Sequence, residues 1–458
     1  MLHRSAEARS FFHDGARLVK EGDLARAELA YRQALLLDPA LAEAHANIAL
    51  LLERDNRIAE AEAHYRRSLD LAPRRPQMYL NYGAMLAGEK RFAEAEKQYR
   101  AALFLDPRAA SAWSNLGALL ACTRREAEAI QCYRFALDID PGHRAAQFNL
   151  AYVLLRQGHF EEGWRCLEAR DGYGPVEALL SCPRWNGEPL QGKTVLIGVE
   201  AGHGDMIQFC RYAPALKAAG ASRVSILCHP GLKSLLARLP GVDETIASDE
   251  TFSRDGWDCW TPALSLPFLF RTRLDTIPAQ IPYLTADVQH VAQWSRVMEA
   301  PAGECRVGLV WKGNPRFEND RDRSLPSLAT LSPLQSVPRV RFFGLQKGTG
   351  EDEVGQNAVA LNLVDLGPHI QDFADTAAIV MNLDLVITVD TAVAHLAGAL
   401  GKPCWVLLPE YKTDWRWLTG REDSPWYPDV MRLFRQEIAG DWTPVVQNVA
   451  TALAQFVR

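Results

Sequence analysis

Long apolar runs are missing from this chain. No stretch of about 18 apolar residues occurs among its 458 residues, and the first residues, MLHRSAEARSFF, have no apolar core of signal-peptide length. We therefore expect neither a membrane span nor an export signal. The nine cysteines, scattered from Cys122 to Cys404, show no CxxC or Cys/His spacing. They fit neither a disulfide framework nor a zinc site and indicate reduced thiols in a cytoplasm.

An excess of positive charge is missing as well. The chain has 50 Lys and Arg against 56 Asp and Glu, a net charge of −6. Phosphate backbones demand a basic patch, and none stands out, so we expect no nucleic-acid partner. The length exceeds that of a single core and predicts more than one domain.

What the chain does contain is a sequence period of 34 residues. Five kinds of residue recur with this period. They are a large residue (Phe11, His45, Tyr79, Trp113), a small residue (Gly15, Ala49, Gly83, Gly117), an alanine (Ala27, Ala61, Ala95, Ala129), a tyrosine (Tyr31, Tyr65, Tyr99, Tyr133) and a proline (Pro39, Pro73, Pro107, Pro141). This pattern is the tetratricopeptide (TPR) signature and predicts stacked helix pairs that form a superhelix. Four full units fit, and a fifth begins at about Arg144 and diverges at Gly163 and Leu167, which is typical of a capping or docking helix.

One asparagine per repeat shares a register position on the first helix of each pair. These residues are Asn47, Asn81, Asn115 and Asn149. A primary amide has two donors and one acceptor, which suits an extended peptide backbone, so we predict that they bind an acceptor polypeptide on the concave wall. The alternative is that they only join neighbouring helices.

After Arg170 the pattern changes to short apolar runs that alternate with helical stretches, which predicts parallel α/β sheets. The expected strands are Val195–Val199, Val224–Cys228, Asp258–Trp260, Val307–Trp311, Arg341–Leu345, Leu385–Val389, Cys404–Leu408 and Arg432–Phe434. We expect a TPR array over 1–170, a linker over 171–193, and two lobes over 194–300 and 301–458, the last ending in a helix over Trp442–Val457. Two such lobes imply a cleft at the carboxyl ends of the strands.

The loop after the first strand reads Glu200-Ala201-Gly202-His203-Gly204-Asp205 and precedes a helix. Gly202 and Gly204 let the backbone approach a ligand, and the helix N-terminus favours negative charge. Asp205 places a carboxylate at the start of this helix, where it can face a ligand or can be only a helix cap.

The loop after the strand Leu385–Val389 carries the candidate phosphate site. It contains Asp390, Thr391, Ala392, Val393 and His395. The residues that open the helix are small, so free N–H groups can face a diphosphate. His395 could add a hydrogen bond, or it could be a structural residue.

Two further strand-end loops contain Lys312 with Asn314, and Gln346 with Lys347. A lysine there can act as a point charge on phosphate, and an amide can hold a base or sugar. We therefore predict that the second lobe binds the donor nucleotide. The stretch Asp320-Arg321-Asp322 superficially matches a DxD metal motif, and we interpret it as a loop; no metal ligand is assigned.

Six stretches resemble bacterial TPR-containing glycosyltransferases whose catalytic part is similar to glycosyltransferase family 9 (heptosyltransferase), of the GT-B fold. They are EAGHGDMIQFCRYAP, VGLVWKGNP, GLQKG, DFADTAAIV, DLVITVDTAVAHLAGALGKP and DWRWL. The resemblance covers nearly the whole chain. It implies an α-helical TPR superhelix followed by a GT-B fold with two Rossmann-like lobes.

The resemblance also implies a metal-independent, inverting hexosyl- or heptosyl-type transfer from a nucleotide sugar, with no cofactor. Asp205 matches the family's catalytic aspartate, Thr391, Ala392 and Val393 match its phosphate-binding turn, and His395 matches its histidine. Two alternatives stay open: a scaffold with an inactive GT-B part, and an enzyme with a glycan or lipid acceptor. Donor base, sugar, acceptor, linkage and oligomeric state are not assigned.

Overall fold

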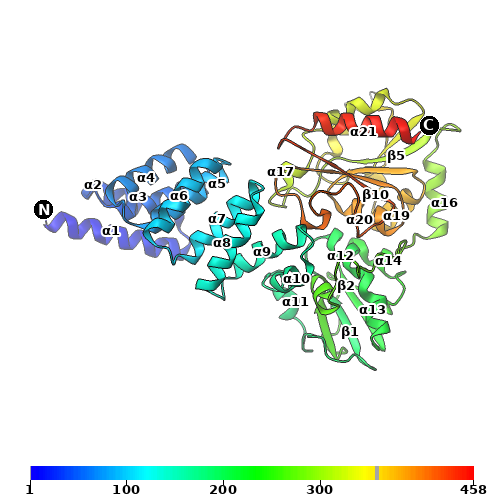
Figure 1. Cartoon of the computed structure of the whole chain (residues 1–458), viewed down its shortest axis with the longest axis horizontal. Helices are drawn as coiled ribbons and strands as arrows, with labels where there is room; N and C mark the ends of the chain where they lie inside the picture. Colours follow the sequence, from blue (N-terminus) through cyan, green and yellow to red (C-terminus); the bar gives the residue numbers. More distant parts are fainter. Residues whose placement is uncertain (1, 356–360, 458) are drawn as a thin grey trace. The chain divides into compact units, whose positions relative to one another are not determined.

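The computed structural model describes residues 2–355 and 361–457 and contains two compact units, one up to Leu150 and one from Ala151 (Figure 1). The first unit is a helical TPR superhelix, and the second contains two parallel α/β sheets, which confirms the predicted fold class. The division falls within helix α9 (Arg144–Arg156), before the array's expected end at residue 170. The bounds 1–170, 171–193, 194–300 and 301–458 stay predictions of domain organisation.

The helices of the repeats follow one another in antiparallel pairs. They are α1 (Leu2–Glu21), α2 (Leu24–Leu37), α3 (Ala42–Arg54), α4 (Ile58–Leu71), α5 (Pro76–Gly88), α6 (Phe92–Leu105), α7 (Ala110–Cys122), α8 (Glu126–Ile139), α9 and α10 (Phe160–Leu167). The turn within each pair contains a residue with positive φ, and these residues are Gly22, Asn56, Lys90, Arg124 and Gly158. Glycine takes this conformation without strain, and asparagine tolerates it better than most residues.

The small residue of each repeat allows its two helices to approach. A Cβ atom on Gly83 would lie 2.7 Å from the ring of Tyr99, and one on Gly117 would lie 2.8 Å from the ring of Tyr133. Both tyrosines are buried. The glycines therefore make room for aromatic rings that fill the space between paired helices.

From the second repeat on, the residue at the position of the large residue has a second role that its size does not reveal. Its polar atom lies within hydrogen-bonding distance of the carbonyl of the preceding repeat's closing proline: 3.2 Å for His45 Nε2 to Pro39 O, 3.1 Å for Tyr79 Oη to Pro73 O, 2.9 Å for Trp113 Nε1 to Pro107 O, and 2.8 Å for Gln147 Nε2 to Pro141 O. Four different side chains thus fix the same turn, because each can place a donor six residues after the proline.

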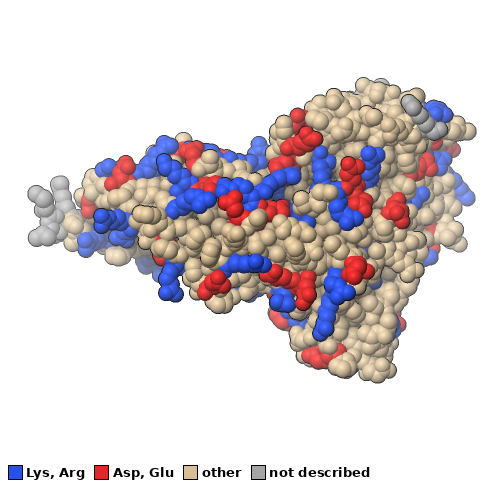
Figure 2. Space-filling model, in the orientation of Figure 1, with Lys and Arg blue, Asp and Glu red and all other residues tan. Residues whose placement is uncertain are grey.

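Ion pairs join the second helices of neighbouring repeats. The guanidinium groups of Arg57, Arg91 and Arg125 each pair with a carboxylate of the preceding repeat, at Glu28 (3.1 Å), Glu62 (2.9 Å) and Glu96 (2.7 Å). Figure 2 shows acidic and basic side chains interspersed on this face of the molecule. Pairs of this exposure contribute little individually, so we regard them as setting the register between repeats.

The first lobe contains a four-stranded parallel sheet in the order β3-β2-β1-β4. Its strands are β1 (Thr194–Gly198), β2 (Arg223–Cys228), β3 (Glu244–Ala247) and β4 (Cys259–Pro262). Strand β3 was not predicted, and β4 begins one residue later than predicted. The segment expected as a linker packs on this lobe: Val176 of α11 (Gly174–Glu177) lies in a core cluster with Leu196 and Trp260.

The second lobe contains a six-stranded parallel sheet in the order β10-β9-β8-β5-β6-β7. Its strands are β5 (Cys305–Val310), β6 (Val340–Gly344), β7 (Leu363–Asp365), β8 (Leu385–Val389), β9 (Cys404–Leu408) and β10 (Met431–Arg435). Helix α21 (Thr443–Phe456) packs into the core of this sheet. The bounds of β8 and β9 match the expectation, whereas β7 was missed and the expected loop at Asp320 forms the short helix α17 (Asp320–Arg323).

Both sheets start from a central strand and extend first to one side and then to the other. The chain passes from β1 to β2 and β3 and then returns to β4, and likewise from β5 to β6 and β7 before it returns to β8. Each reversal leaves a crevice at the carboxyl ends of two neighbouring strands, where ligands of such sheets bind. Within the described residues, no helix has both the length and the apolarity needed to cross a membrane.

Replacing Gly83 by Val tests the helix contact in the array. The new side chain would overlap the Tyr99 ring, so we expect a loss of about 1–3 kcal/mol in the free energy of unfolding. Gly88→Val in the same helix is the control, because nothing lies within 4 Å of a Cβ there. Urea unfolding followed by circular dichroism measures both variants, and equal midpoints would contradict the packing role.

Candidate functional site

The loops after β1 and β8 belong to different lobes, and their helices pack directly on each other. Helix α12 (His203–Phe209) lies against α20 (Ala392–Ala399). A Cβ on Gly204 would lie 2.8 Å from His395 Cδ2 and 3.4 Å from Ala392 Cα. The absence of a side chain at Gly204 thus brings the predicted catalytic loop and the predicted phosphate loop together.

Asp205 lies in the first turn of α12 and holds two donors. Its Oδ2 accepts a hydrogen bond from the Gly202 N–H (2.7 Å), and its Oδ1 pairs with the Arg416 guanidinium. The first contact shows that Asp205 does cap the helix, as one reading of the sequence expects. The side chain keeps an exposed fraction of 20%, so capping leaves the carboxylate accessible.

Arg416 joins the candidate site, although it was not among the residues predicted from the sequence. It lies in the loop Asp414–Leu418 of the second lobe and contacts Asp205 in the first. It also donates to both carboxylate oxygens of Asp414 (3.0 and 3.1 Å) and to Gln208 Oε1 (2.7 Å). The stretch DWRWL resembles TPR-containing glycosyltransferases, but no local pattern indicates that its arginine contacts a residue 211 positions away.

His395 of α20 is buried. Its Nδ1 lies 2.9 Å from the Tyr427 hydroxyl, and its ring stacks on Trp417 at 5.2 Å. Burial, together with the charges of Arg416 and Arg211, holds the pKa of His395 well below its usual value. His395 is therefore a neutral imidazole fixed on both sides.

The start of α20 carries the residues predicted to bind phosphate. Thr391 is the N-cap, and its hydroxyl lies 2.9 Å from that of Thr388 rather than capping an N–H of the described helix. The N–H groups of the first turn have no intrahelical acceptors. Burial, and then the charge of Asp414, raises the pKa of the neighbouring Asp390 to about 6.

Gln346 and Lys312 lie together between the ends of β5 and β6. The Gln346 amide accepts from the N–H groups of Trp311 and Lys312 (both 3.0 Å) and donates to the carbonyls of Lys312 (3.1 Å) and Thr349 (2.9 Å). The Lys312 ammonium pairs with Glu353 (3.0 Å). In this structure both side chains hold loops of the second lobe together. Either side chain would have to leave these partners before it could contact a nucleotide sugar.

Lys347 and Asn314 are more accessible. The Lys347 ammonium donates to Gly367 O (3.1 Å), and its side chain is 54% exposed. Asn314 is exposed, and its side-chain oxygen accepts from the Arg316 N–H (3.0 Å). The Lys347 ammonium also lies 3.8 Å from Glu351, but both side chains are more exposed than Lys312 and Glu353, so Lys347 is the more accessible of the two predicted lysines.

The four asparagines of the array are all half-buried. Asn47 Nδ2 donates to the Tyr31 hydroxyl (3.1 Å) and so joins α3 to α2, as the structural reading expects. Asn81 instead accepts from Gln77 within its own helix (2.7 Å). The register position is thus not used in one uniform way.

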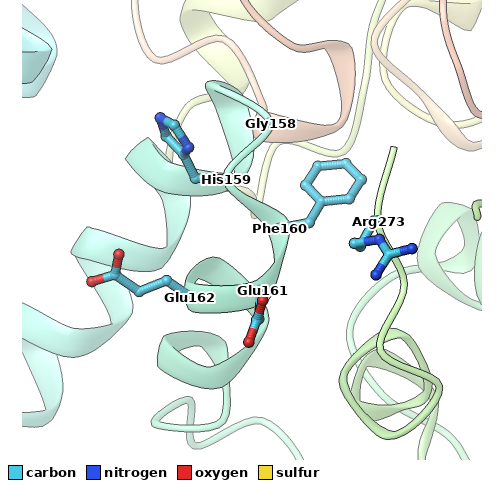
Figure 3. Close-up of a pocket in the computed structure, with 6 residues that line it drawn as sticks. All are labelled: Gly158, His159, Phe160, Glu161, Glu162 and Arg273. Carbon is cyan, nitrogen blue, oxygen red and sulfur yellow. The ribbon is translucent and has the colours of Figure 1, made fainter. Parts of the chain in front are cut away.

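A pocket of about 320 Å³ lies at the start of α10 (Figure 3). It is lined by Gly158, His159, Phe160, Glu161, Glu162 and Arg273. None of these is a predicted site residue, so the pocket is separate from the loops at the strand ends.

Two protein families match parts of the chain. Residues 15–76, 86–143 and 124–163 match a tetratricopeptide repeat model, and residues 334–407 match glycosyltransferase family 9 (heptosyltransferase). The second match includes Lys347 and Asp390–His395 but neither Asp205 nor Arg416.

Protein FlbA of Caulobacter vibrioides is 32% identical over an alignment of 337 residues, which covers 67% of this chain and 54% of that protein. The chain thus spans about half the length of this curated relative. A structure described as "Functional Characterization of Pseudomonas Aeruginosa pilF" matches with 22% identity and a TM-score of 0.36 over 39% of this chain and 82% of that one. YrrB, described as a TPR protein with an unusual peptide-binding site, matches with 21% identity and a TM-score of 0.30 over 35% and 82%.

The repeats, the family 9 segment and the similarity to FlbA define the class. The chain is a TPR-containing, glycosyltransferase-like protein.

Stability should depend on pH through His203, which is stacked between His229 (4.4 Å) and Phe373 (5.1 Å). Burial, and then the charge of His229, lowers the pKa of His203 from 6.5 to about 4. The unfolded state therefore binds a proton at a higher pH than the folded state, and the free energy of unfolding decreases as pH falls from 6.5 towards 4. The raised pKa of Asp390 has the opposite effect, because it lowers the free energy of unfolding as pH rises from about 3.8 to about 6.

We expect His203→Phe, which keeps a stacked ring but cannot titrate, to reduce the drop in unfolding midpoint between about pH 7 and about pH 5. The exposed His159 provides the control variant His159→Gln. An unchanged pH profile for His203→Phe would show that this ring does not set the acid sensitivity.

Proposed function

We propose that this protein transfers a sugar from a nucleotide-sugar donor to an acceptor hydroxyl, and that the acceptor is a protein bound by the TPR array. The packing of α12 on α20 at Gly204 supports this proposal most directly. It brings a partly exposed carboxylate close to the N-terminus of a helix that can bind phosphate.

The reaction follows from these groups. The acceptor oxygen attacks the anomeric carbon from the side opposite the nucleotide, while its proton passes to the Asp205 carboxylate. The bond from the anomeric carbon to the phosphate oxygen breaks, and the nucleotide leaves with the electron pair. Configuration at the anomeric carbon is inverted.

The N–H groups of α20 offer positive charge for the leaving phosphate at Thr391, Ala392 and Val393. Lys347 is within reach of solvent and could add a point charge, with Asn314, Gln346, Lys312 and Asp390 as further donor-side candidates. His395 would act as a neutral hydrogen-bonding group. The mechanism needs no cofactor or metal, and a cytoplasmic location would fit a nucleotide-sugar donor.

Asp205→Asn tests the proposed base. Asparagine keeps the shape of aspartate and is as good a helix cap, but it cannot accept the proton, so we expect transfer to fall by about 10²–10⁴ while nucleotide affinity survives. Release of nucleotide from UDP-, GDP-, ADP-, dTDP- and CMP-linked sugars is measured with EDTA present. Full activity of the variant would remove the base assignment, and no activity of the wild type with any donor and a broad acceptor panel would favour a scaffold.

The asparagine ladder tests the protein acceptor. Replacing Asn81 and Asn115 together by Ala should raise KM for a protein acceptor and leave donor hydrolysis by water unchanged, because these amides lie on the repeats and not on the sugar site. Gln33→Ala, which removes an exposed amide of α2 outside the ladder, is the matched control and should leave KM unchanged. Identical acceptor kinetics in the double variant would make the ladder structural.

A further inference from the structure

The Arg416 guanidinium is enclosed by polar and aromatic side chains. Its nitrogens donate to side-chain oxygens of Asp205, Asp414 and Gln208. The ring of Trp415 lies 4.2 Å from its central carbon, and that of Phe209 lies 5.6 Å away. Charged and polar partners at its nitrogens and two neighbouring aromatic rings leave this group little freedom to move.

These contacts come from both lobes. Gln208, Phe209 and Asp205 belong to α12 of the first lobe, whereas Asp414 and Trp415 belong to the loop of Arg416 itself. The Arg416 side chain is only 8% exposed. An arginine buried in this way is stable because two carboxylates compensate its charge, and it connects the two lobes at Asp205.

The Asp205 carboxylate is fixed by one donor on each oxygen. Gly202 N–H binds Oδ2 from within α12, and Arg416 binds Oδ1 from the second lobe. Each carboxylate oxygen can accept more than one hydrogen bond, so both retain capacity for an incoming hydroxyl. The orientation of the carboxylate is thus set before any substrate arrives, which avoids an entropic cost in the reaction.

We infer that Arg416 is the positioning residue of Asp205: it acts through this carboxylate rather than on the donor phosphate. This inference rests on the proposed function. Asp414 holds the guanidinium from the other side, so the two acidic residues and Arg416 form one unit. Lysine would not replace Arg416, because a single ammonium cannot keep the planar set of contacts to Asp205, Asp414 and Gln208.

A double-mutant cycle tests this inference with the full chain. The variants are Arg416→Gln, Asp205→Asn and their combination, and the measurements are nucleotide release from the five donor classes with water as acceptor and calorimetric affinity for UDP, GDP, ADP, dTDP and CMP. Arg416→Gln alone should lower turnover by about 10–10²-fold and leave nucleotide affinity within about threefold. In the Asp205→Asn background the same change should alter turnover by less than about threefold, because both changes remove one function.

Arg435→Gln is the matched control for damage to the loop. Arg435 donates to the carbonyls of Trp417 and Leu418 (both 2.7 Å), and so supports the same loop without contacting Asp205. It should lower the unfolding midpoint at least as much as Arg416→Gln but retain turnover within about threefold of wild type. Arg416→Lys should give turnover between that of wild type and that of Arg416→Gln.

Three results would overturn the inference. Multiplicative losses in the double variant would show that Arg416 acts independently of Asp205, and a nucleotide affinity reduced more than tenfold by Arg416→Gln would place it on the donor. Equal loss of turnover in Arg435→Gln would reduce its role to loop stability. A wild-type protein that releases nucleotide from none of the donors would instead remove the proposed function, and with it this inference.

Discussion

The contact of Arg416 with Asp205 is the interaction on which the candidate site depends. A buried guanidinium is costly unless carboxylates compensate it, and here one carboxylate comes from each lobe. The same contact therefore stabilises the approach of the lobes and fixes the orientation of the carboxylate that we propose as the base. Gly204 makes the approach possible, because any larger residue would meet His395 and Ala392.

The two sheets have complementary roles around this contact. Each returns past its first strand and so opens a crevice at its carboxyl edge, at β1 and β4 in one lobe and at β5 and β8 in the other. The part that matches glycosyltransferase family 9, residues 334–407, contributes the helix α20. The carboxylate and the arginine lie outside that part, so the site is a property of the assembled lobes and not of the matched segment.

The repeat array shows how a structural period can be stricter than a sequence period. His45, Tyr79, Trp113 and Gln147 share no chemistry beyond a donor atom, yet their polar atoms all lie within hydrogen-bonding distance of the closing proline carbonyls. The asparagines show the opposite: one residue type at one register position bonds a tyrosine at Asn47 and a glutamine at Asn81. The same residue type at a repeated position therefore does not guarantee the same partner. A common contact recurs where the backbone presents the same acceptor in every repeat.

The sequence by itself determined the repeat array, the parallel α/β class and the strands β8 and β9, because these depend on local periodicity and on short apolar runs. It also placed Asp205 and His395 after strands, because these positions are local features, whereas their roles stay predictions. Only the tertiary structure decided that Arg416 contacts Asp205, that Lys312 pairs with Glu353, and that the Gln346 amide forms hydrogen bonds with backbone groups. Each of these contacts joins residues far apart in the chain, and a side chain's partner at such a separation is set by how the sheets and helices pack rather than by its neighbours in sequence.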